Sequence, residues 1–281
     1  MSLDTLNIVY FSPTGTTRRS AHNIAAGTGL RVREFDRTSV TSRKTGAHFS
    51  QNDLVLIALP VYGGRLPRIT PEIFNGIGAD RSPTAIAVLY GNRHYDDALL
   101  ELKNTAAGMG FTPIAAGAFV GEHSYTRNVG TNRPDASDVP AQAEFGRRFL
   151  EKACAGSQTK TIATHAVSAA SDSGLQNFRL SELSPTVPGH FPYEKPVSNL
   201  QIAPVTSDAC VDCQTCVEGC PVGAISHDDP RVVNREKCIS CCYCVKVCPN
   251  GARRMEDPRI LASINRLETQ FTARREAETF F

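Results

Sequence analysis

The sequence lacks an apolar run long enough to cross a membrane. Its longest run, Leu54–Leu59, is far shorter than the roughly 20 residues that a membrane-spanning helix needs. The sequence also lacks the basic flank and apolar core of a secretory signal, because Met1-Ser2-Leu3-Asp4 passes directly into a strand-like stretch. We therefore expect a cytoplasmic protein with no membrane span.

An excess of one charge sign is also missing. The chain has 30 Lys and Arg residues against 28 Asp and Glu residues, a formal net charge of +2, and no long block of either sign. Proteins that bind nucleic acids usually carry a concentrated basic patch. We therefore expect no nucleic-acid partner, whereas small acidic ligands and protein partners stay open.

Cysteine is scarce except in one short segment. Of ten cysteines, nine lie between Cys210 and Cys248, and the tenth is Cys154. Such a density indicates either a disulfide scaffold or a metal site. Because a cytoplasmic chain of 281 residues with 41% apolar content can form its core without disulfides, a metal site is favoured. Cys154, near the end of an expected helix, is most simply a small buried hydrophobe.

Strand-like and helix-like segments alternate over the first half of the chain. Strands are expected at Asn7–Phe11, Arg31–Phe35, Asp53–Leu59, Thr84–Tyr90 and Pro113–Val120. Helices are expected at Thr16–Ala26, Pro71–Gly76, Asp96–Gly108 and Pro140–Ala155. Continuous apolar runs are typical of parallel strands buried on both faces, and the alternation predicts an α/β doubly wound sheet. The second crossover, Arg37–Gln51, has no apolar stripe and is open to being a loop.

Three unusual loops follow the expected strands, at Ser12–Thr17, Pro60–Arg65 and Tyr90–Tyr95. In a doubly wound sheet such loops meet in the crevice where ligands bind. The first loop opens a helix, is rich in hydroxyls and contains no lysine or carboxylate, which favours a terminal phosphate. No GxGxxG pattern follows the first strand, which argues against a dinucleotide site. Taken alone, this loop is also compatible with a helix cap that binds no ligand.

The other two loops carry aromatic and glycine residues. The rings of Tyr62 and Tyr95 are suited to stack on a flat heterocycle, and Gly63, Gly64 and Gly91 allow backbone amides to approach its edge. A phosphate at one end and stacking at the other indicate flavin mononucleotide (FMN). The residues expected to hold it are Ser12, Thr14, Gly15, Thr16, Thr17, Pro60, Val61, Tyr62, Gly63, Gly64, Arg65, Gly91, Asn92, Arg93 and Tyr95.

The first loop resembles the phosphate loop of the flavodoxin family, TxTGxT, since Thr14-Gly15-Thr16-Thr17 follows Ser12. The resemblance covers about the first 155 residues. It implies a flavodoxin-like FMN-binding domain over residues 1–156, with a parallel five-stranded sheet in the order 2-1-3-4-5.

The cysteine-rich segment contains one motif twice. Each copy reads CxxCxxCxxxC and is followed by proline, Pro221 or Pro249. This run is typical of ferredoxins with two 4Fe-4S clusters, in which the fourth cysteine of each motif ligates the other cluster. The ligand sets are therefore expected to be crossed. They are Cys210, Cys213, Cys216 and Cys248 for one cluster, and Cys238, Cys241, Cys244 and Cys220 for the other.

Zinc is the alternative metal, but zinc sites of this kind use two CxxC pairs separated by a longer gap. Cys242 is surplus to both motifs, and we interpret it as a neighbour of a cluster and not a ligand. The segment resembles bacterial two-cluster ferredoxins over residues 203–254. Residues 157–202, rich in proline around Phe191 and Tyr193, are expected to form an extended linker, and residues 255–281 a helix (Pro258–Glu276) and tail that clamp the domains.

The whole chain resembles the EFR-type fused flavodoxin-ferredoxin proteins of anaerobic bacteria and archaea. The resemblance rests on the segments PVYGGRLP, YGNRHYDDAL, GAFVGEHSY and RREAETF. It implies FMN, two 4Fe-4S clusters and an electron-transfer role. We expect single electrons to pass between these cofactors and a redox partner protein. The alternatives are an FMN-dependent reductase that acts directly on a substrate and a redox sensor. The donor, the acceptor and the oligomeric state, a homodimer included, stay open.

Two arginines in the expected flavin loops, Arg65 and Arg93, are candidates to stabilise the negative charge of a reduced flavin. Their alternative role is that of solvated surface charges. Residues 122–125 follow the last expected strand on the same rim, where they are placed to donate protons, to face the ferredoxin domain or to form a hinge.

Overall fold

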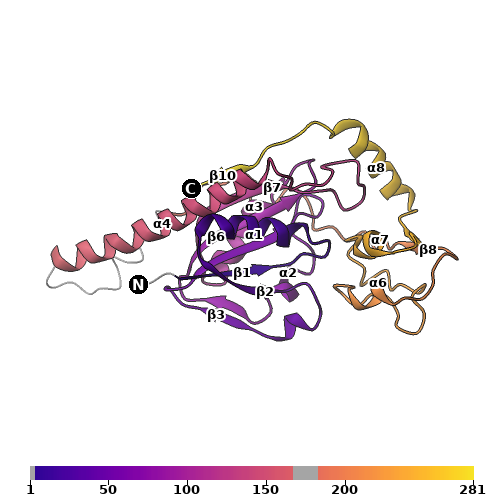
Figure 1. Cartoon of the computed structure of the whole chain (residues 1–281), viewed down its shortest axis with the longest axis horizontal. Coiled ribbons are helices and arrows are strands. Elements are labelled where there is room, and N and C mark those ends of the chain that lie inside the picture. Colours follow the sequence, from indigo (N-terminus) through magenta and orange to yellow (C-terminus); the bar gives the residue numbers. More distant parts are fainter. Residues whose placement is uncertain (1–3, 167–182) are drawn as a thin grey trace.

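The computed structural model describes residues 4–166 and 183–281. Figure 1 shows a twisted sheet with helices on both faces, and a smaller unit of short helices beside one end of it. Its strands are β1 (Thr5–Tyr10), β2 (Arg31–Asp36), β3 (Ala47–Phe49), β4 (Leu54–Pro60), β5 (Ile77–Ala79), β6 (Pro83–Tyr90), β7 (Thr112–Val120), β8 (Val205–Thr206), β9 (Arg253–Arg254) and β10 (Glu278–Phe280). Its α-helices are α1 (Thr16–Thr28), α2 (Thr70–Ile73), α3 (Ala98–Gly108), α4 (Val139–Ala166), α6 (Thr215–Glu218), α7 (Tyr243–Val247) and α8 (Pro258–Gln270).

The main sheet has the strand order β10-β7-β6-β4-β1-β2. Strands β1, β2, β4, β6 and β7 are all parallel, and counted along the chain their order is the flavodoxin-like 2-1-3-4-5. The sequence-based fold class is thus confirmed. The sixth strand was not foreseen: β10, from the last residues of the chain, pairs antiparallel with β7.

The sheet is buried on both faces. Successive apolar residues of its strands point to opposite faces, so each face carries an apolar cluster. In β1, Leu6 and Ile8 face α1 and α4, whereas Val9 belongs to the apolar cluster on the side of α2 and α3. Phe145 and Phe149 of α4 close the first cluster, and both are fully buried. A side chain of this size stabilises the fold by about 1.5–3 kcal/mol when fully buried.

The second crossover contains no helix, only a short 3-10 turn (Ser42–Lys44) and β3, which pairs with β5. Arg37 takes the place of an apolar stripe. It is 2% exposed, and its guanidinium donates hydrogen bonds to the backbone carbonyls of Ile73, Ser42, Thr45, Arg43 and Asn75. The expectation of a loop here is confirmed, and its order comes from a buried cation surrounded by carbonyl oxygens.

The boundary between the first domain and the linker needs correction. Helix α4 runs to Ala166 and not to Ala155, so the segment after residue 156 begins as helix. Residues 167–182 of the expected linker lie outside the described residues. The rest of that linker packs on α3, where buried Asp97 accepts hydrogen bonds from the amides of His190 and Glu194, each at 2.9 Å. Phe191, in the same part of the linker, is 75% exposed.

The C-terminal tail joins the two units. Helix α8 is shorter than expected, since it ends at Gln270 and the chain then returns to the sheet as β10 (Figure 1). Asn92 Nδ2 donates to the carbonyls of Phe271 and Ala273 at 2.7 and 2.9 Å, and Tyr95 Oη donates to Glu278 Oε2 at 2.8 Å. The tail therefore fixes the loop that follows β6.

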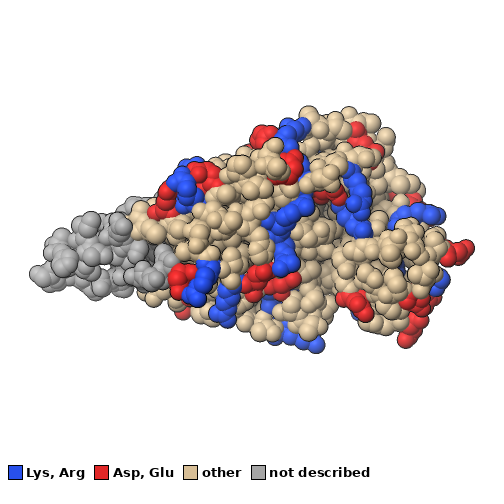
Figure 2. Space-filling model, viewed as in Figure 1, with Lys and Arg blue, Asp and Glu red and all other residues tan. Residues whose placement is uncertain are grey.

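The charges in Figure 2 are interspersed: on this face Lys and Arg lie among Asp and Glu and do not gather into one large patch of a single sign. No helix in the described part of the chain combines the length and apolarity that a membrane crossing requires.

Candidate functional site

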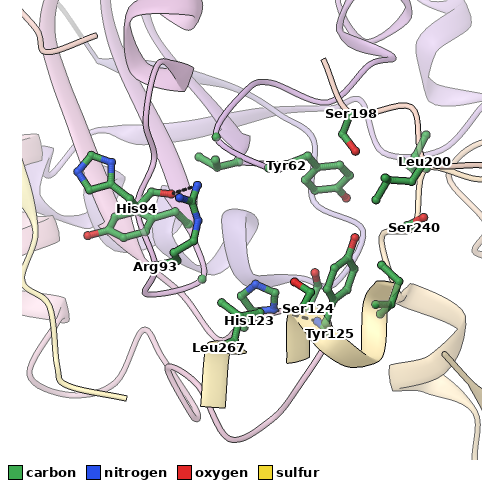
Figure 3. A pocket seen from close by; sticks show the side chains of 18 of the residues that line it. Tyr62, Arg93, His94, His123, Ser124, Tyr125, Ser198, Leu200, Ser240 and Leu267 are labelled. Carbon is green, nitrogen blue, oxygen red and sulfur yellow. Dashed lines mark hydrogen bonds between the residues drawn. The ribbon is translucent and has the colours of Figure 1, made fainter. Parts of the chain in front are cut away.

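A pocket of about 350 Å³ lies where the loops after β4, β6 and β7 meet the C-terminal unit (Figure 3). The β4 loop supplies Val61–Gly64, the β6 loop Gly91, Arg93 and His94, and the β7 loop His123–Tyr125. The opposite wall comes from residues far along the chain, which are Ser198, Leu200, Ile239, Ser240, Arg259, Ile260, Ser263 and Leu267. Only the first wall was foreseen from the sequence.

Close backbone approach shapes the first wall. A β-carbon added to Gly91 would lie 2.3 Å from His123 Cδ2, so no larger residue fits between the β6 and β7 loops. Gly64 has φ +91°, and a β-carbon there would lie 2.1 Å from Asp96 Oδ2. The expected role of these glycines, to let the backbone pass close to its neighbours, agrees with this geometry.

Two tyrosines project into the pocket from opposite loops. Tyr62 and Tyr125 point toward one another in Figure 3. Burial raises the pKa of both phenols above the usual range, and nearby Cys238, Cys241 and Cys242 add to the rise. Both rings therefore lie between the pocket and the cysteine-rich segment. Tyr62 was expected in the pocket; Tyr125 was noted only as a rim residue.

His123 lines the same pocket as a neutral imidazole. Burial, together with the positive charges of Lys246 and Arg93, lowers its pKa to about 4. Its Nδ1 accepts a hydrogen bond from the Tyr125 amide at 3.1 Å, so the ring proton resides on Nε2. This residue offers the pocket a neutral hydrogen-bond donor.

The two arginines singled out from the sequence have different surroundings. Arg93 lines the pocket, forms an ion pair with Asp96, and has a side chain 29% exposed. Arg65 lies outside it: its Nε and Nη2 bond both carboxylate oxygens of Glu101 at 2.8 and 2.9 Å, and its guanidinium lies 4.2 Å from the Tyr193 ring centroid. Arg65, which was expected to face a flavin, is thus turned away from this pocket, because Glu101 and Tyr193 hold its guanidinium.

Eight other expected residues do not line the pocket. They are the loop residues Ser12, Thr14, Gly15, Thr16 and Thr17, and also Pro60, Asn92 and Tyr95. Tyr95 is 1% exposed and lies under His94, whose ring stacks on it at 4.8 Å. Asn92 is used to hold the tail, and Pro60 ends β4. His94 lines the pocket where Tyr95 was expected, and the Tyr95 hydroxyl instead donates to Glu278 of the tail.

The loop after β1 has both hydrogen-bonded amides and amides that are free to bind an anion: those of Ser12 and Gly15 already have partners. Gly15 is left-handed (φ 79°) at the start of α1, and the Ser12 hydroxyl accepts from the amide of Arg18 at 3.0 Å. Among the described residues, the amides and hydroxyls of Thr14, Thr16 and Thr17 have no hydrogen-bond partner. Several such amides at a helix N-terminus fit a phosphate group, which would satisfy them.

Eight cysteines surround two small cavities. The outer cavity is lined by Cys210, Cys213, Cys216 and Cys248. The inner cavity is lined by Cys220, Cys238, Cys241 and Cys244. Each cavity thus takes three cysteines from one motif and the last cysteine from the other, which is the crossed grouping expected from the spacing. Cys242 also borders the inner cavity, and it is 2% exposed.

Each cavity has the donors that a sulfur-ligated cluster requires. Four thiols converge on it, and backbone amides already point at sulfur: Ala224 N donates to Cys220 Sγ at 3.3 Å and Ala252 N to Cys248 Sγ at 3.2 Å. Among the described residues, no three His, Cys, Asp or Glu side chains are placed to hold a single metal ion. The thiols and amides together fit 4Fe-4S clusters.

The inner cavity adjoins the pocket. Ile239 and Ser240, which line the pocket, lie between Cys238 and Cys241 of the inner cavity. Ile239 and Cys241 also belong to the same apolar cluster as the β4 and β6 strands. No residue of the α/β unit lines the outer cavity, and its Cys213 is exposed.

Polar contacts hold the two units together around the inner cavity. Lys246 Nζ donates to Glu122 Oε1 at 2.6 Å and to the His123 carbonyl at 3.1 Å. Buried Arg43 donates to the Pro221 carbonyl at 2.6 Å, and Arg68 donates to the Glu236 carbonyl. Lys246 and Glu122 are only 14% and 13% exposed, so this ion pair is largely shielded from solvent.

Comparisons with known proteins bear on both units. Residues 203–226 and 231–254 match the family model of the 4Fe-4S binding domain. A flavodoxin from the domain Archaea is 14% identical, with a TM-score of 0.37, and the match covers 53% of this chain and 99% of that chain. The rubredoxin oxygen:oxidoreductase of Desulfovibrio gigas is 12% identical, with a TM-score of 0.37, covering 54% and 36%. A WrbA-like flavodoxin from Agrobacterium tumefaciens is 13% identical, with a TM-score of 0.36, covering 54% and 98%. No curated protein matched the sequence.

The C-terminal unit is a 4Fe-4S binding domain, and the N-terminal unit has the flavodoxin-like fold by its own strand order. The chain is thus a fusion of a flavodoxin-like domain and a ferredoxin-like domain.

Proposed function

We propose that this protein transfers single electrons between an FMN in the pocket and two 4Fe-4S clusters, one in each cavity, and exchanges them with a redox partner protein. Flavin and clusters supply complementary chemistry, since a flavin exchanges two electrons and each cluster exchanges one. The ligands are Cys210, Cys213, Cys216 and Cys248 for the outer cluster, and Cys220, Cys238, Cys241 and Cys244 for the inner cluster.

One observation carries the proposal: the pocket and the inner cavity share a wall. Ile239 and Ser240 face the pocket from a loop whose two ends are the inner ligands Cys238 and Cys241. Tyr62 and Tyr125 line the pocket, and Cys238 and Cys241 of the inner cavity are near both phenols. Flavin and inner cluster would therefore be neighbours, with no solvent layer required between them.

The residues of the α/β unit have separate tasks toward the flavin. The amides and hydroxyls of Thr14, Thr16 and Thr17 bind its phosphate. The Nε2 proton of His123 supplies a donor to a ring heteroatom, and Arg93 supplies a positive charge on the same side. The rings of Tyr62 and Tyr125 exclude water from the wall toward the inner cavity.

The size of the pocket favours a carrier over a reductase. At about 350 Å³ it lies at the small end of the range for ligand sites, roughly 300–1,000 Å³. An isoalloxazine would occupy most of that space. Arg259, Ile260, Ser263 and Leu267 of α8 also line the pocket, and little room is left in it for a separate substrate.

Electron transfer through the outer cluster tests the proposal. The protein is purified without oxygen, reduced, and mixed with oxidised cytochrome c, a one-electron acceptor too large to enter the pocket. We expect rapid oxidation of the wild type and at least tenfold slower oxidation of Cys248→Ala, which lacks an outer-cluster ligand. Equal rates would mean that electrons leave directly from the flavin, and faster oxidation by a small quinone in both proteins would favour the reductase.

A further inference from the structure

The two halves of the ferredoxin-like domain are related by the sequence repeat, but they differ at one buried position. Each half ends in Cys-Pro-x-Gly-Ala, and the next residue is Ile225 in the first half and Arg253 in the second. The preceding alanines are equivalent, since each donates its amide to the last cysteine sulfur of its motif. The repeat therefore places an isoleucine beside the inner cavity and an arginine beside the outer cavity.

The guanidinium of Arg253 is buried, but its hydrogen bonds to the protein use only part of its donors. Its side chain is 3% exposed; Nε donates to Cys216 Sγ at 3.2 Å, and Nη2 donates to the Pro230 carbonyl. Nη1 is also buried, and among the described residues it has no hydrogen-bond partner. A buried, unsatisfied N–H of a charged group is strongly unfavourable, so it indicates an acceptor that completes the site.

The outer cavity offers such an acceptor when it holds a cluster. Arg253 lines this cavity together with the four outer ligands. The sulfides and thiolates of a cluster accept hydrogen bonds, and such bonds, together with nearby charge, set its reduction potential. Reduction adds one negative charge to the cluster, and a buried guanidinium that donates to its sulfur stabilises that charge.

We propose, on the basis of the function proposed above, that Arg253 determines the order in which the two clusters accept electrons. Its hydrogen bond to Cys216 and its free Nη1 raise the reduction potential of the outer cluster above that of the inner cluster, where Ile225 supplies neither donor nor charge. The first electron to enter the iron-sulfur domain therefore resides on the outer cluster.

The positive charge of Arg253 also acts on cysteines of the inner cavity. Burial raises the pKa of Cys238 and of Cys244, and the positive charge of Arg253 opposes part of that rise. The inner cluster therefore receives part of the same stabilisation, and the difference between the clusters comes from the hydrogen bonds, which only the outer ligand Cys216 receives. The quantity to measure is the gap between the two potentials.

The experiment is an anaerobic redox titration of the full-length protein, followed by electron paramagnetic resonance. The variant Arg253→Met keeps the length of the side chain and removes its donors and charge. The outer signal is identified as the one that persists in Cys220→Ala. We expect Arg253→Met to shift the distribution of one electron between the clusters at least tenfold toward the inner cluster, which is about 59 mV for a one-electron couple.

The matched control is Ile225→Met at the equivalent position, which should leave the gap between the potentials unchanged. Arg253→Lys retains the charge without the planar fork, and it should shift the distribution in the same direction by a smaller factor; it also serves if Arg253→Met loses iron. An unchanged gap in the arginine variant that retains its iron would overturn the role of Arg253 alone. Two intact clusters that exchange no electrons with the flavin would instead overturn the proposed function, leaving the gap measurable.

Discussion

The inner and outer cavities are built by the same motif but lie in different surroundings. The inner cavity is part of the interface between the domains, with Cys241 buried in the apolar cluster of the main sheet. The outer cavity is remote from that sheet, and Val211 and Val232, near it in the sequence, are 65% and 58% exposed. The equivalent loop of the inner half, by contrast, carries Ile239, which is 8% exposed.

The two cavities differ in their position relative to the main sheet, and under the proposed function this position suggests a different role for each cluster. A cluster at the interface is suited to exchange electrons with the flavin, because its ligand loop forms the pocket wall. The outer cavity is the more accessible of the two, since its Cys213 is exposed, so under the proposed function its cluster would be the one that a partner protein reaches. Electrons would then pass in the sequence partner, outer cluster, inner cluster and flavin, or in reverse.

The largest expected effect comes from removing one cysteine ligand from each cavity in turn, because each variant should lose one cluster and keep the other. Cys220→Ala should lose the inner cluster and keep the outer one, although Cys220 is adjacent in sequence to the outer ligands. Iron and acid-labile sulfide should each fall from about eight to about four per chain. Flavin reduction by a low-potential donor protein should then fall by orders of magnitude.

Cys248→Ala is the counterpart, since it should lose the outer cluster and keep the inner one. Paramagnetic resonance of the two variants should show different remaining signals. If Cys220→Ala damaged the cluster of Cys210, Cys213 and Cys216 instead, the crossed assignment would be refuted. A preparation of wild type with zinc and no sulfide would end the cluster hypothesis.

The sequence predicted features that depend on residues close together in the chain. The apolar runs of the parallel strands, the phosphate loop and the cysteine spacing are local patterns, and they gave the sheet and the grouping of thiols. The directions of the side chains in the β6 loop could not be predicted in this way, because they depend on residues far along the chain. Tyr95 and Asn92 were expected to face the flavin, but their partners Glu278 and Phe271 lie about 180 positions later.

The far wall of the pocket was missed for the same reason. Ile239 and Ser240 look like spacers between cysteines, and only the docking of the domains turns them toward the flavin loops. The closing RREAETF segment was assigned partly to the expected helix and partly to the tail; it proves to contain β10. Arg65 could not be separated from Arg93 by sequence, because its partner Glu101 lies in α3 and its ring partner, Tyr193, in the linker.

The next prediction weakens flavin binding and leaves both clusters in place. Thr16→Ala deletes a hydroxyl that has no partner among the described residues and is placed to bond the phosphate. A hydrogen bond to a charged group contributes about 1.5–3 kcal/mol, so the Kd for FMN should rise roughly 10- to 150-fold. Fluorescence titration of the flavin-free protein measures this change.

Riboflavin supplies the control for Thr16, because it lacks the phosphate. Its affinity should be unchanged in Thr16→Ala, and the iron content should equal that of the wild type. An equal loss of affinity for both flavins would show that Thr16 acts on the ring or on the fold, and the phosphate assignment would have to be abandoned.

Arg93 and Arg65 offer a sharper comparison on the flavin side. Arg93→Gln should make the bound flavin harder to reduce, by roughly 1 kcal/mol or about 40 mV, because the charge is close but screened by Asp96 and by solvent. Arg65→Gln should leave the flavin potentials unchanged and reduce the free energy of unfolding by about 3 kcal/mol, since it leaves Glu101 largely buried without its cation. Spectroelectrochemistry and urea unfolding separate the two effects. A shift in flavin potential in Arg65→Gln alone would reverse the assignment.

The last expected effect is a pH dependence of stability that arises from His123, in the loop after β7. Burial and the charges of Lys246 and Arg93 lower the pKa of His123 from 6.5 to about 4 in the folded protein. Between these values a falling pH protonates the unfolded chain first, so the folded state binds fewer protons and loses stability as the pH falls. That contribution is fully present above about pH 6.5, and it should amount to on the order of 1–3 kcal/mol lost by pH 4.

His123→Gln should therefore lose less stability than the wild type when the pH is lowered from 7 to 5. His227→Gln, an exposed position in the ferredoxin-like domain, should behave as the wild type. Thermal unfolding of the three proteins at both pH values measures the difference, and an identical pH response of His123→Gln and wild type would mean that the imidazole is not kept neutral by the interface.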